Sequence, residues 1–335
     1  MKGMDAGRVT VVIPCYKVSR HVLDLLDRIG PEVEAIVVVD DACPEGTGAL
    51  VQAQCLDARV QVLFHAANQG VGGAVMTGYR HAIAAGADVI VKLDGDGQMD
   101  PALLGRFIAP ILEGDADYTK GNRFHDLRNI SRMPKLRLFG NAGLSFLNKL
   151  STGYWDIFDP TNGYTAISAQ VAVMLPLDRI SQRYFFESDL LFRLGTFRAV
   201  VRDVPMDAQY GDEVSNLSIG KVLPEFLFKH VRNTGKRIFY NYYLRDLTAA
   251  SLELLLGAML LLFGVGYGSW HWWQSLATGK TAATGVIMLP AMTVLMGMQL
   301  LLAFLSQDIA GVPRRVLTRV RKAGPAGGGS GGVAP

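Results

Sequence analysis

This sequence has few cysteines and a small net charge. Only three cysteines occur among 335 residues, Cys15, Cys43 and Cys55, and no two lie at C-x-x-C spacing. We therefore expect buried thiols in a reducing compartment, and neither a disulfide framework nor a cysteine-based metal site. The formal net charge is only +3. This argues against the strong positive field that nucleic-acid binding requires, so we expect no nucleic-acid partner.

The first residues also lack the apolar stretch of a secretory signal. The apolar run that follows Arg8 is interrupted at Lys17, which is too short for the hydrophobic region of a signal peptide. We therefore expect the N-terminal domain to lie in the cytosol.

Hydrophobic residues make up 50% of the chain, and two long apolar stretches lie near its C-terminal end. Residues 247–267 are apolar except for Glu253, and residues 281–306 carry no charge. Each can cross a hydrocarbon layer about 30 Å thick, which takes roughly 20 helical residues. The sequence therefore predicts two membrane spans within residues 247–308, which anchor the protein because two helices cannot enclose a conduit.

Lysine and arginine flank the two spans unevenly. Five lie shortly before the first span and five follow the second, whereas the connecting segment holds Lys280 alone. The positive-inside rule then predicts an integral inner or plasma membrane protein with both termini cytoplasmic and the Trp270–Lys280 loop outside. Glu253 needs a partner at its depth in the first span. The sequence names none, and a contact within a homo-oligomer or with a lipid headgroup would provide one.

Residues 218–246 combine basic and aromatic side chains at near-helical spacing. This pattern is typical of an amphipathic helix that lies on anionic membrane lipids, and an ordinary helix capping the domain is the alternative. Residues 309–335 begin with several basic residues and end in a glycine-rich stretch. We expect this tail to be disordered.

Residues 1–217 alternate short apolar runs with amphipathic segments. Strands are expected over residues 8–17, 34–42, 59–65 and 88–98, and helices over 21–29 and 72–86. This alternation predicts an α/β fold with a mostly parallel, Rossmann-like sheet. In such sheets ligands bind beyond the carboxyl ends of the strands, which here carry Tyr16, Asp40, Asp41 and Asp94.

The segment Asp94-Gly95-Asp96-Gly97-Gln98 follows the fourth expected strand. Two carboxylates two residues apart, with an amide oxygen two further on, suit Mg²⁺ or Mn²⁺ as hard cations. A calcium loop of the EF-hand kind is not expected, because its twelfth position lacks glutamate. We predict that Asp94, Asp96 and Gln98 hold a divalent metal.

A second glycine-rich segment, N-Q-G-V-G-G, includes Gly70. It follows the third expected strand, whereas a dinucleotide fingerprint follows the first. A hydride-transfer enzyme is therefore not expected, and the loop is predicted to let the backbone approach a ligand. A nucleotidyltransferase is also disfavoured, because C-Y-K-V-S-R-H after the first strand contains no glycine.

These segments, V-V-I-P-C-Y-K, V-V-V-D-D-A, N-Q-G-V-G-G and K-L-D-G-D-G-Q, resemble in order and spacing the family-two inverting glycosyltransferases. The likeness is greatest to polyprenyl-phosphate glycosyltransferases of the dolichol-phosphate mannose synthase kind, over residues 9–217, followed by two spans. The resemblance implies a GT-A domain with D-x-D-x-Q as its metal site. It also implies that the nucleotide sugar is bound by Pro14, Tyr16, Asp40, Asp41, Gly70, Asp94 and Gly95.

Downstream segments carry the implied acceptor site. The resemblance places Arg123, Arg137 and Asn162 at the acceptor, and Asp189 as the acidic residue of a helix, with Glu187 as the second choice. Guanidinium groups suit phosphate oxygens because they bind them in a bidentate manner. At Asn216 the family commonly has lysine, so one expected cation of the anion site is replaced.

The implied reaction takes a sugar from a UDP- or GDP-sugar to a membrane polyprenyl phosphate, with inversion and with a divalent metal at Asp96. A phosphate acceptor needs no strong base, since its second pKa is about 6. Transfer to a hydroxyl of a lipid-linked glycan is the alternative, and it would use Asp189 as general base. A non-catalytic membrane scaffold is a further alternative. Processive polysaccharide synthases are disfavoured because the chain lacks their Q-x-x-R-W motif.

Overall fold

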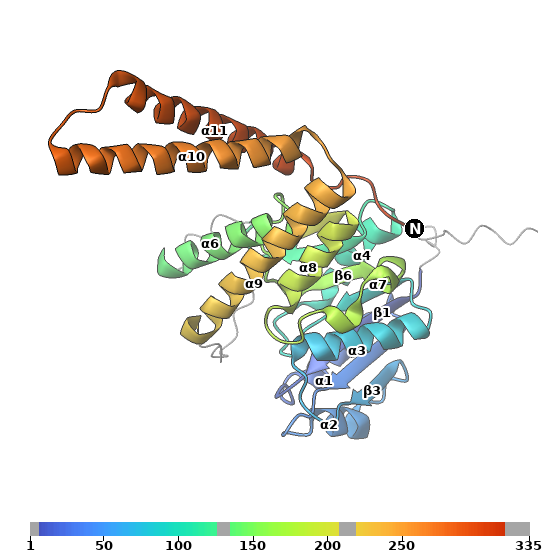
Figure 1. The fold of residues 1–335 in the computed structure, drawn as a ribbon. Helices are drawn as coiled ribbons and strands as arrows, with labels where there is room; N and C mark the ends of the chain where they lie inside the picture. The colour runs from blue at the N-terminus through green and yellow to red at the C-terminus, as the bar shows by residue number, and fades with distance from the viewer. Residues whose placement is uncertain (1–6, 126–134, 208–218, 319–335) are drawn as a thin grey trace, which may run out of the picture.

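A single seven-stranded sheet organises the N-terminal domain (Figure 1). The computed structural model describes residues 7–125, 135–207 and 219–318. The strand order among these residues is β3-β2-β1-β4-β6-β5-β7. The strands are β1 (Val9–Cys15), β2 (Ala35–Asp40), β3 (Val60–Phe64), β4 (Val89–Lys92), β5 (Tyr118–Asn122), β6 (Thr165–Ser168) and β7 (Val201–Pro205).

The sheet is mostly parallel, as the sequence predicts. Strands β1, β2, β3 and β4 pair in parallel, and so do β5 and β7. Among the described strands, only β6 runs antiparallel, between β4 and β5. Because β6 points backwards, its first residue, Thr165, lies in register with Lys92 at the end of β4 and with Lys120 in β5.

Helices cover both faces of the sheet. Alternate residues of β1 point to opposite faces, so Val11 and Ile13 join one hydrophobic core and Val12 joins the other. The first core packs under α1 (Val22–Asp27) and α4 (Leu104–Leu112), which is preceded by a short 3₁₀ turn, η1 (Pro101–Leu103). The second packs under α3 (Val71–Ala84), α7 (Ala169–Met174) and α8 (Phe186–Phe197). Helix α2 (Thr47–Gln54) and the 3₁₀ turn η2 (Leu177–Arg179) complete this part of the fold.

Two further helices, α6 (Lys135–Thr152) and α9 (Ile219–Phe239), pack outside α8. The buried ring of His230 in α9 lies 2.8 Å from the Ser151 hydroxyl of α6, measured from Nδ1 to Oγ. A different side of α9 exposes Leu223, Leu227 and Val231 at four-residue spacing. The helix therefore seals the domain with a buried polar side, which includes His230, and presents apolar side chains outward on an adjacent side.

A hairpin of two long helices follows a π-helical segment, η3 (Tyr240–Arg245), and projects from the domain (Figure 1). Helices α10 (Ala249–Thr278) and α11 (Thr284–Ala310) are long and apolar enough to cross a membrane. They approach closely at glycines, and a Cβ at Gly297 would lie 2.7 Å from the Leu261 amide nitrogen. Small residues at such contacts are typical of packed membrane helices.

Two sequence expectations about the hairpin change. The predicted outer loop Trp270–Lys280 is mostly helix, since α10 continues to Thr278 and the loop begins only there. Glu253 has a partner within the chain, because the Gln307 side-chain amide donates to its carboxylate at 2.8 Å. An inter-subunit contact is therefore not needed to satisfy this carboxylate.

The hairpin is attached to the domain by the buried carboxylate of Asp308 near the end of α11. Arg237 of α9 donates to both of its oxygens, at 2.7 and 2.9 Å. The Tyr242 hydroxyl and the Trp155 indole N–H donate at 2.6 and 2.8 Å. We call these four residues the Asp308 cluster. It joins the end of the second apolar helix to α9, η3 and the segment after α6.

The chain after α11 returns to the sheet. The backbone N–H of Leu317 donates to both oxygens of Asp117, at 3.0 Å each, and Thr318 donates at 3.4 Å. Asp117 is fully buried and also accepts from the Val200 N–H. Residues 309–318, predicted as the start of a disordered tail, are therefore docked on the domain; the glycine-rich part lies outside the described residues.

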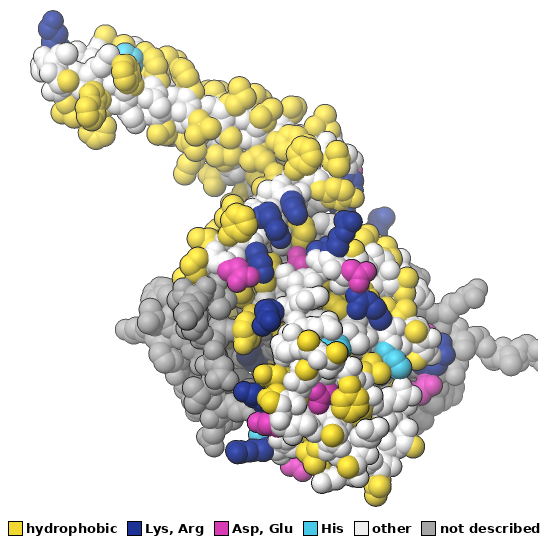
Figure 2. Space-filling model, turned by 60° about the horizontal axis from the view of Figure 1, so that its bottom comes forward, with side chains coloured by type: hydrophobic (Ala, Val, Ile, Leu, Met, Phe, Trp, Pro, Cys, Tyr) yellow, Lys and Arg dark blue, Asp and Glu magenta, His cyan; other side chains and the backbone are white. Residues whose placement is uncertain are grey.

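Lysine and arginine side chains gather around the base of the hairpin (Figure 2). The hairpin itself is covered with hydrophobic side chains in the same view. The apolar spans within residues 247–308 and the lysines and arginines that flank them predict this separation of charge from apolar surface.

Candidate active site

The carboxyl ends of β1, β2 and β4 meet at one edge of the sheet, here called the catalytic edge. Pro14 is buried within β1, whereas the ring of Tyr16, just beyond it, is 45% exposed. Lys17 and Ala42, which follow β1 and β2, both have positive φ, 60° and 52°. Non-glycine residues in this region cost about 1–2 kcal/mol each, and such strain concentrates at ligand-binding loops.

Asp40 and Asp41 hold the loops that follow β2. Asp40 accepts hydrogen bonds from the N–H groups of Cys43 and Gly48, at 2.7 and 2.5 Å, and so fixes the start of α2. Asp41 accepts from the N–H groups of Gln69 and Gly70. Both carboxylates are almost completely buried, at 3% and 2% exposure. The structure therefore brings both predicted residues to the catalytic edge, where they organise its loops.

Gly70 immediately precedes α3 and has φ of 86°, a conformation that favours glycine. A Cβ there would also lie 2.7 Å from the carbonyl oxygen of Gln182. The Gly73 N–H donates to that same oxygen. The glycine-rich loop thus packs against the segment that precedes α8, which explains why small residues are needed.

The Asp94–Gln98 turn leaves β4 at the catalytic edge. Lys92, the last residue of β4, is buried and its ammonium lies 2.6 Å from Asp94 Oδ1. The Gln98 N–H donates to Asp96 Oδ1 at 3.0 Å, which tightens the turn. Gly95 is buried. Gly163, from the loop before β6, leaves room for this pair, because a Cβ at that position would collide with Asp94 Oδ2 and Lys92 Nζ.

Lys92 also interacts with Glu187, which in turn interacts with a second buried lysine, Lys120. Glu187 of α8 lies 3.9 Å from Lys92. Burial raises the pKa of Glu187, and the two lysines oppose the rise. Burial acts to lower the pKa of Lys92, but the carboxylates of Asp94 and Glu187 outweigh it and hold that pKa above its usual value. Burial lowers the pKa of Lys120 to about 8.

Asp189 lies elsewhere in the packing. Its carboxylate accepts from the Ser181 N–H at 2.8 Å, from Arg193 at 3.3 Å and from the Asn233 side chain at 3.4 Å. These contacts tie α8 to α9 and to the segment that borders the glycine-rich loop. Of the two acidic residues considered from the sequence, Glu187 is therefore the one whose charge interacts with the Asp94 turn.

The predicted acceptor residues have different surroundings. Arg123, just beyond β5, forms a two-pronged contact with buried Asp159, from Nε at 2.7 Å and from Nη2 at 3.1 Å. Asn162 is buried, and its side chain accepts from the Tyr164 N–H and donates towards Asp159. Asn162 therefore shapes the turn that carries Asp159. Arg137 lies in α6 with its side chain outside the described residues, and Asn216 lies outside them entirely.

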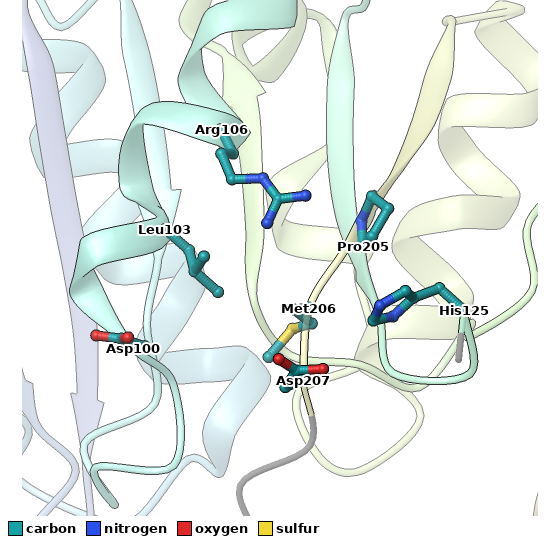
Figure 3. Close-up of a pocket in the computed structure, with 7 residues that line it drawn as sticks. All are labelled: Asp100, Leu103, Arg106, His125, Pro205, Met206 and Asp207. Atoms are coloured by element: carbon teal, nitrogen blue, oxygen red, sulfur yellow. The ribbon is translucent and has the colours of Figure 1, made fainter. Parts of the chain in front are cut away.

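A small cavity of about 150 Å³ lies beside the ends of β5 and β7 (Figure 3). Arg106 of α4 and His125 beyond β5 point towards it, and Met206 lies behind (Figure 3). Met206 also contacts the Asn162 amide, at 3.2 Å. The cavity has no signature in the sequence, because its lining comes from three segments that are distant in the chain.

The residues at the turn fit a divalent metal that is coordinated partly by the protein and partly by a bound substrate. Within the described ranges, no three His, Cys, Asp or Glu side chains form a self-contained metal site. Asp94 and Asp96 supply two carboxylates, and Mg²⁺ is commonly bound by one or two carboxylates together with substrate phosphates. Lys92 carries one positive charge against the two carboxylates of Asp94 and Asp96, so a net negative charge remains at the turn for a cation.

Comparison with known proteins decides the family. The family described as "Glycosyl transferase family 2" matches this chain over residues 10–173. Undecaprenyl-phosphate mannosyltransferase of Micrococcus luteus is 30% identical over 203 residues, which cover 59% of this chain and 82% of that protein. Polyprenol monophosphomannose synthase of Mycolicibacterium smegmatis is 30% identical over 231 residues, covering 66% and 85%. The chain belongs to glycosyl transferase family 2.

This family 2 glycosyltransferase has other relatives that agree with the assignment. A UDP-N-acetylglucosamine–dolichyl-phosphate N-acetylglucosaminyltransferase of Methanococcus voltae is 26% identical, covering 60% of this chain and 86% of the relative. Among solved structures, glucosyl-3-phosphoglycerate synthase of Mycobacterium tuberculosis, in complex with Mn²⁺, UDP-glucose and phosphoglyceric acid, has a TM-score of 0.52 at 17% identity. The alignment covers 69% of this chain and 79% of that one. This likeness confirms the GT-A fold.

Proposed function

We propose that this glycosyltransferase transfers a sugar from a nucleotide-diphosphate donor to a membrane polyprenyl phosphate, with a divalent metal and with inversion. The observation that carries the proposal is the Asp94–Asp96 turn, held by Lys92 at the catalytic edge of a family 2 domain that carries two membrane-length helices. The names of three relatives support a polyprenyl or dolichyl phosphate as acceptor.

In this proposal the donor lies across the carboxyl ends of β1, β2 and β4. Tyr16 offers an exposed ring for the nucleotide base, since aromatic rings bind the flat faces of bases well. Asp40 and Asp41 contribute by holding the loops on either side of the nucleotide. The buried Lys92 orients Asp94 through their 2.6 Å contact, so that its second oxygen remains available.

Asp94 and Asp96 would hold Mg²⁺ or Mn²⁺, with Gln98 beside them. The metal would neutralise charge on the diphosphate leaving group. The chain's part is to preorganise these oxygens, so that little reorganisation is needed when charge develops. Gly163 contributes by leaving space for the Asp94 carboxylate.

The acceptor phosphate would attack the anomeric carbon from the face opposite the diphosphate, which inverts that centre. No general base is required, because the phosphate is anionic near neutral pH. This agrees with the engagement of Asp189 by Ser181, Arg193 and Asn233. Arg123, which is held by Asp159, is proposed to bind the acceptor phosphate. Arg137 of α6 is proposed to bind the same phosphate.

A hydroxyl acceptor on a lipid-linked glycan is the second candidate. It is favoured by one observation, the position of Glu187 beside Lys92 with a raised pKa. A carboxylate with a raised pKa is a better proton acceptor near neutral pH. In that case Glu187 would replace Asp189 as the proposed base.

The membrane arrangement is part of the same proposal. Both termini and the active site are proposed to be cytoplasmic, with the outward apolar side of α9 on the lipid surface. A Lys280→Cys variant tests this, because the thiol in the loop between α10 and α11 should react with an impermeant reagent from outside intact cells. Reaction only after the cells are opened would contradict the proposed topology.

The decisive experiment measures transfer of radiolabelled sugar from a panel of UDP- and GDP-sugars to undecaprenyl phosphate, using the full-length protein in detergent with Mg²⁺ or Mn²⁺. The expected product is a lipid-linked sugar that mild acid releases, because a glycosyl phosphate is acid-labile. An acid-stable lipid product would support the hydroxyl acceptor instead. Donor binding without transfer or hydrolysis under any condition would favour the non-catalytic scaffold.

A further inference from the structure

A second, larger cavity of about 350 Å³ lies where the end of α11 meets the catalytic domain. Its apolar wall includes Val200, just before β7, and Val201, the first residue of β7. Ile309 at the end of α11 and Val312 in the segment after it complete this wall. Trp155 borders the cavity and is fixed there by its hydrogen bond to Asp308. The cavity therefore lies at the junction between the catalytic domain and the membrane-length hairpin.

Two arginines from opposite sides of the junction line this cavity. Arg202 belongs to β7 and Arg314 follows α11, and both side chains are exposed. Neither guanidinium forms a hydrogen bond or an ion pair with the residues that the structure describes. Asp156 also lines the cavity, so the charged lining is one carboxylate and two guanidinium groups. The excess positive charge suits an anionic group that both arginines can reach.

An exposed apolar stripe leads from the cavity along α11. Ile309, Leu302 and Leu295 are 46%, 53% and 70% exposed. Residues seven apart lie two helical turns apart on nearly the same side of a helix. The stripe therefore runs from the two arginines into the part of the hairpin that the bilayer would surround, as a hydrocarbon chain attached to a headgroup would do.

We propose that this cavity binds an anionic phospholipid of the bilayer, with its phosphate between Arg202 and Arg314 and an acyl chain along Ile309, Leu302 and Leu295. The proposal rests on the proposed insertion of the hairpin into a membrane. It does not depend on the transfer reaction. Such a lipid would bridge the hairpin and β7 beside the Asp308 cluster, and so strengthen the attachment of the domain to its anchor.

The bound lipid is distinct from the glycosyl acceptor. Strand β7 runs parallel to β5, and their carboxyl ends, at Pro205 and Asn122, lie in register at the catalytic edge. Val201 begins β7 at the opposite edge of the sheet. A phosphate held by Arg202 and Arg314 therefore lies on the far side of the sheet from Asp94, and the lipid is a structural ligand.

Native mass spectrometry of the full-length protein, titrated with phosphatidylglycerol in detergent, tests the proposal. We expect one phosphatidylglycerol to bind more tightly than phosphatidylcholine with the same chains. Arg202→Gln and Arg314→Gln should each weaken that binding by about tenfold or more, since each removes a charge-assisted contact with the phosphate. Val312→Trp should weaken it by filling the cavity without any change of charge.

Arg315→Gln is the matched control, because it removes the same charge one residue away from a side chain that does not line the cavity. Equal weakening in Arg314→Gln and Arg315→Gln would show a general attraction to anionic lipid and would overturn the site. Displacement of the lipid by millimolar inorganic phosphate would also overturn it, since the site would then recognise a free anion. Melting temperatures within 2–3 °C of the native protein identify variants that remain folded.

The transfer assay separates this inference from the proposed function. Sugar transfer with no selective lipid binding would refute the phospholipid site and leave the reaction standing. Selective lipid binding in a protein that transfers no sugar would support the site and count against the reaction.

Discussion

Replacing Asp308 by asparagine should loosen the hairpin from the catalytic domain. The exposed fractions of the Arg237 and Asp308 side chains are only 3% and 4%. The substitution keeps the shape of the side chain but leaves the Arg237 charge buried without its counter-charge. Breaking a buried ion pair in this way costs about 3–5 kcal/mol. At the usual unfolding entropy of about 2.1 cal/mol/K per residue, the melting temperature of a chain of 335 residues shifts by about 1.4 °C per kcal/mol, so it should fall by roughly 4–7 °C.

Thermal unfolding of the full-length protein in detergent, followed by circular dichroism, measures this change. Arg237→Met should cause a comparable loss, because it leaves the Asp308 carboxylate with only the Tyr242 and Trp155 donors. The double variant should be more stable than the sum of the two losses predicts, since neither charge is then left alone. The coupling between the two substitutions is the quantity that the structure predicts.

Asp246→Asn is the matched control for this measurement. Asp246 pairs with Arg198 at 2.8 Å, but the two side chains are 42% and 57% exposed. An exposed ion pair contributes at most about 1 kcal/mol. Equal shifts for Asp308→Asn and Asp246→Asn, or strictly additive losses in the double variant, would refute the claim that the Asp308 cluster fastens the hairpin.

Three further changes test the active site and the packing of α9. Gly163→Ala should lower kcat by about 100-fold by displacing Asp94, whereas Gly143→Ala, which meets no atom within 4 Å, should leave the transfer rate unchanged. Asp96→Asn should reduce transfer to background at every Mg²⁺ concentration without lowering the melting temperature, and full activity would remove it from the metal site. Burial lowers the pKa of His230 from 6.5 to about 4, so its stabilising effect, about 3 kcal/mol, is present above pH 6.5 and is lost towards pH 4. His230→Gln should flatten the fall of melting temperature over that range, and an unchanged slope would assign the acid sensitivity to other groups.

The fold could be predicted because the pattern of apolar residues depends on burial alone. The strands β1, β2 and β4 are buried on both faces, so each appears as a nearly continuous apolar run that ends in a polar turn. The reversed strand β6 could not be predicted in the same way. It has only four residues, Thr165–Ser168, and its direction is set by pairing with strands that are distant in sequence.

The site could be predicted only in part, because the sequence does not show the direction in which each side chain points. Glu187 and Asp189 are two residues apart on α8, and successive helical residues are about 100° apart around the axis. One therefore faces the Asp94 turn while the other faces α9, and the sequence does not state which. Lys92 was missed because it ends an otherwise apolar strand, V-I-V-K. A lysine that interrupts such a run was the available signal, since buried lysines are rarely without a charged partner.

Because the chain returns to Asp117 after α11, the hairpin is not a simple C-terminal extension of the domain. It is a loop closed at both ends: α9 and η3 precede it on the domain, and Leu317 and Thr318 follow it on the sheet. A truncation before α10 would therefore remove two of the three backbone donors of a fully buried carboxylate. Burial already raises the pKa of Asp117, so the shortened domain should favour its protonated form. An anchor transplanted from another membrane enzyme would need to bring residues 311–318 with it, because Leu317 and Thr318 within this segment supply the missing donors to Asp117.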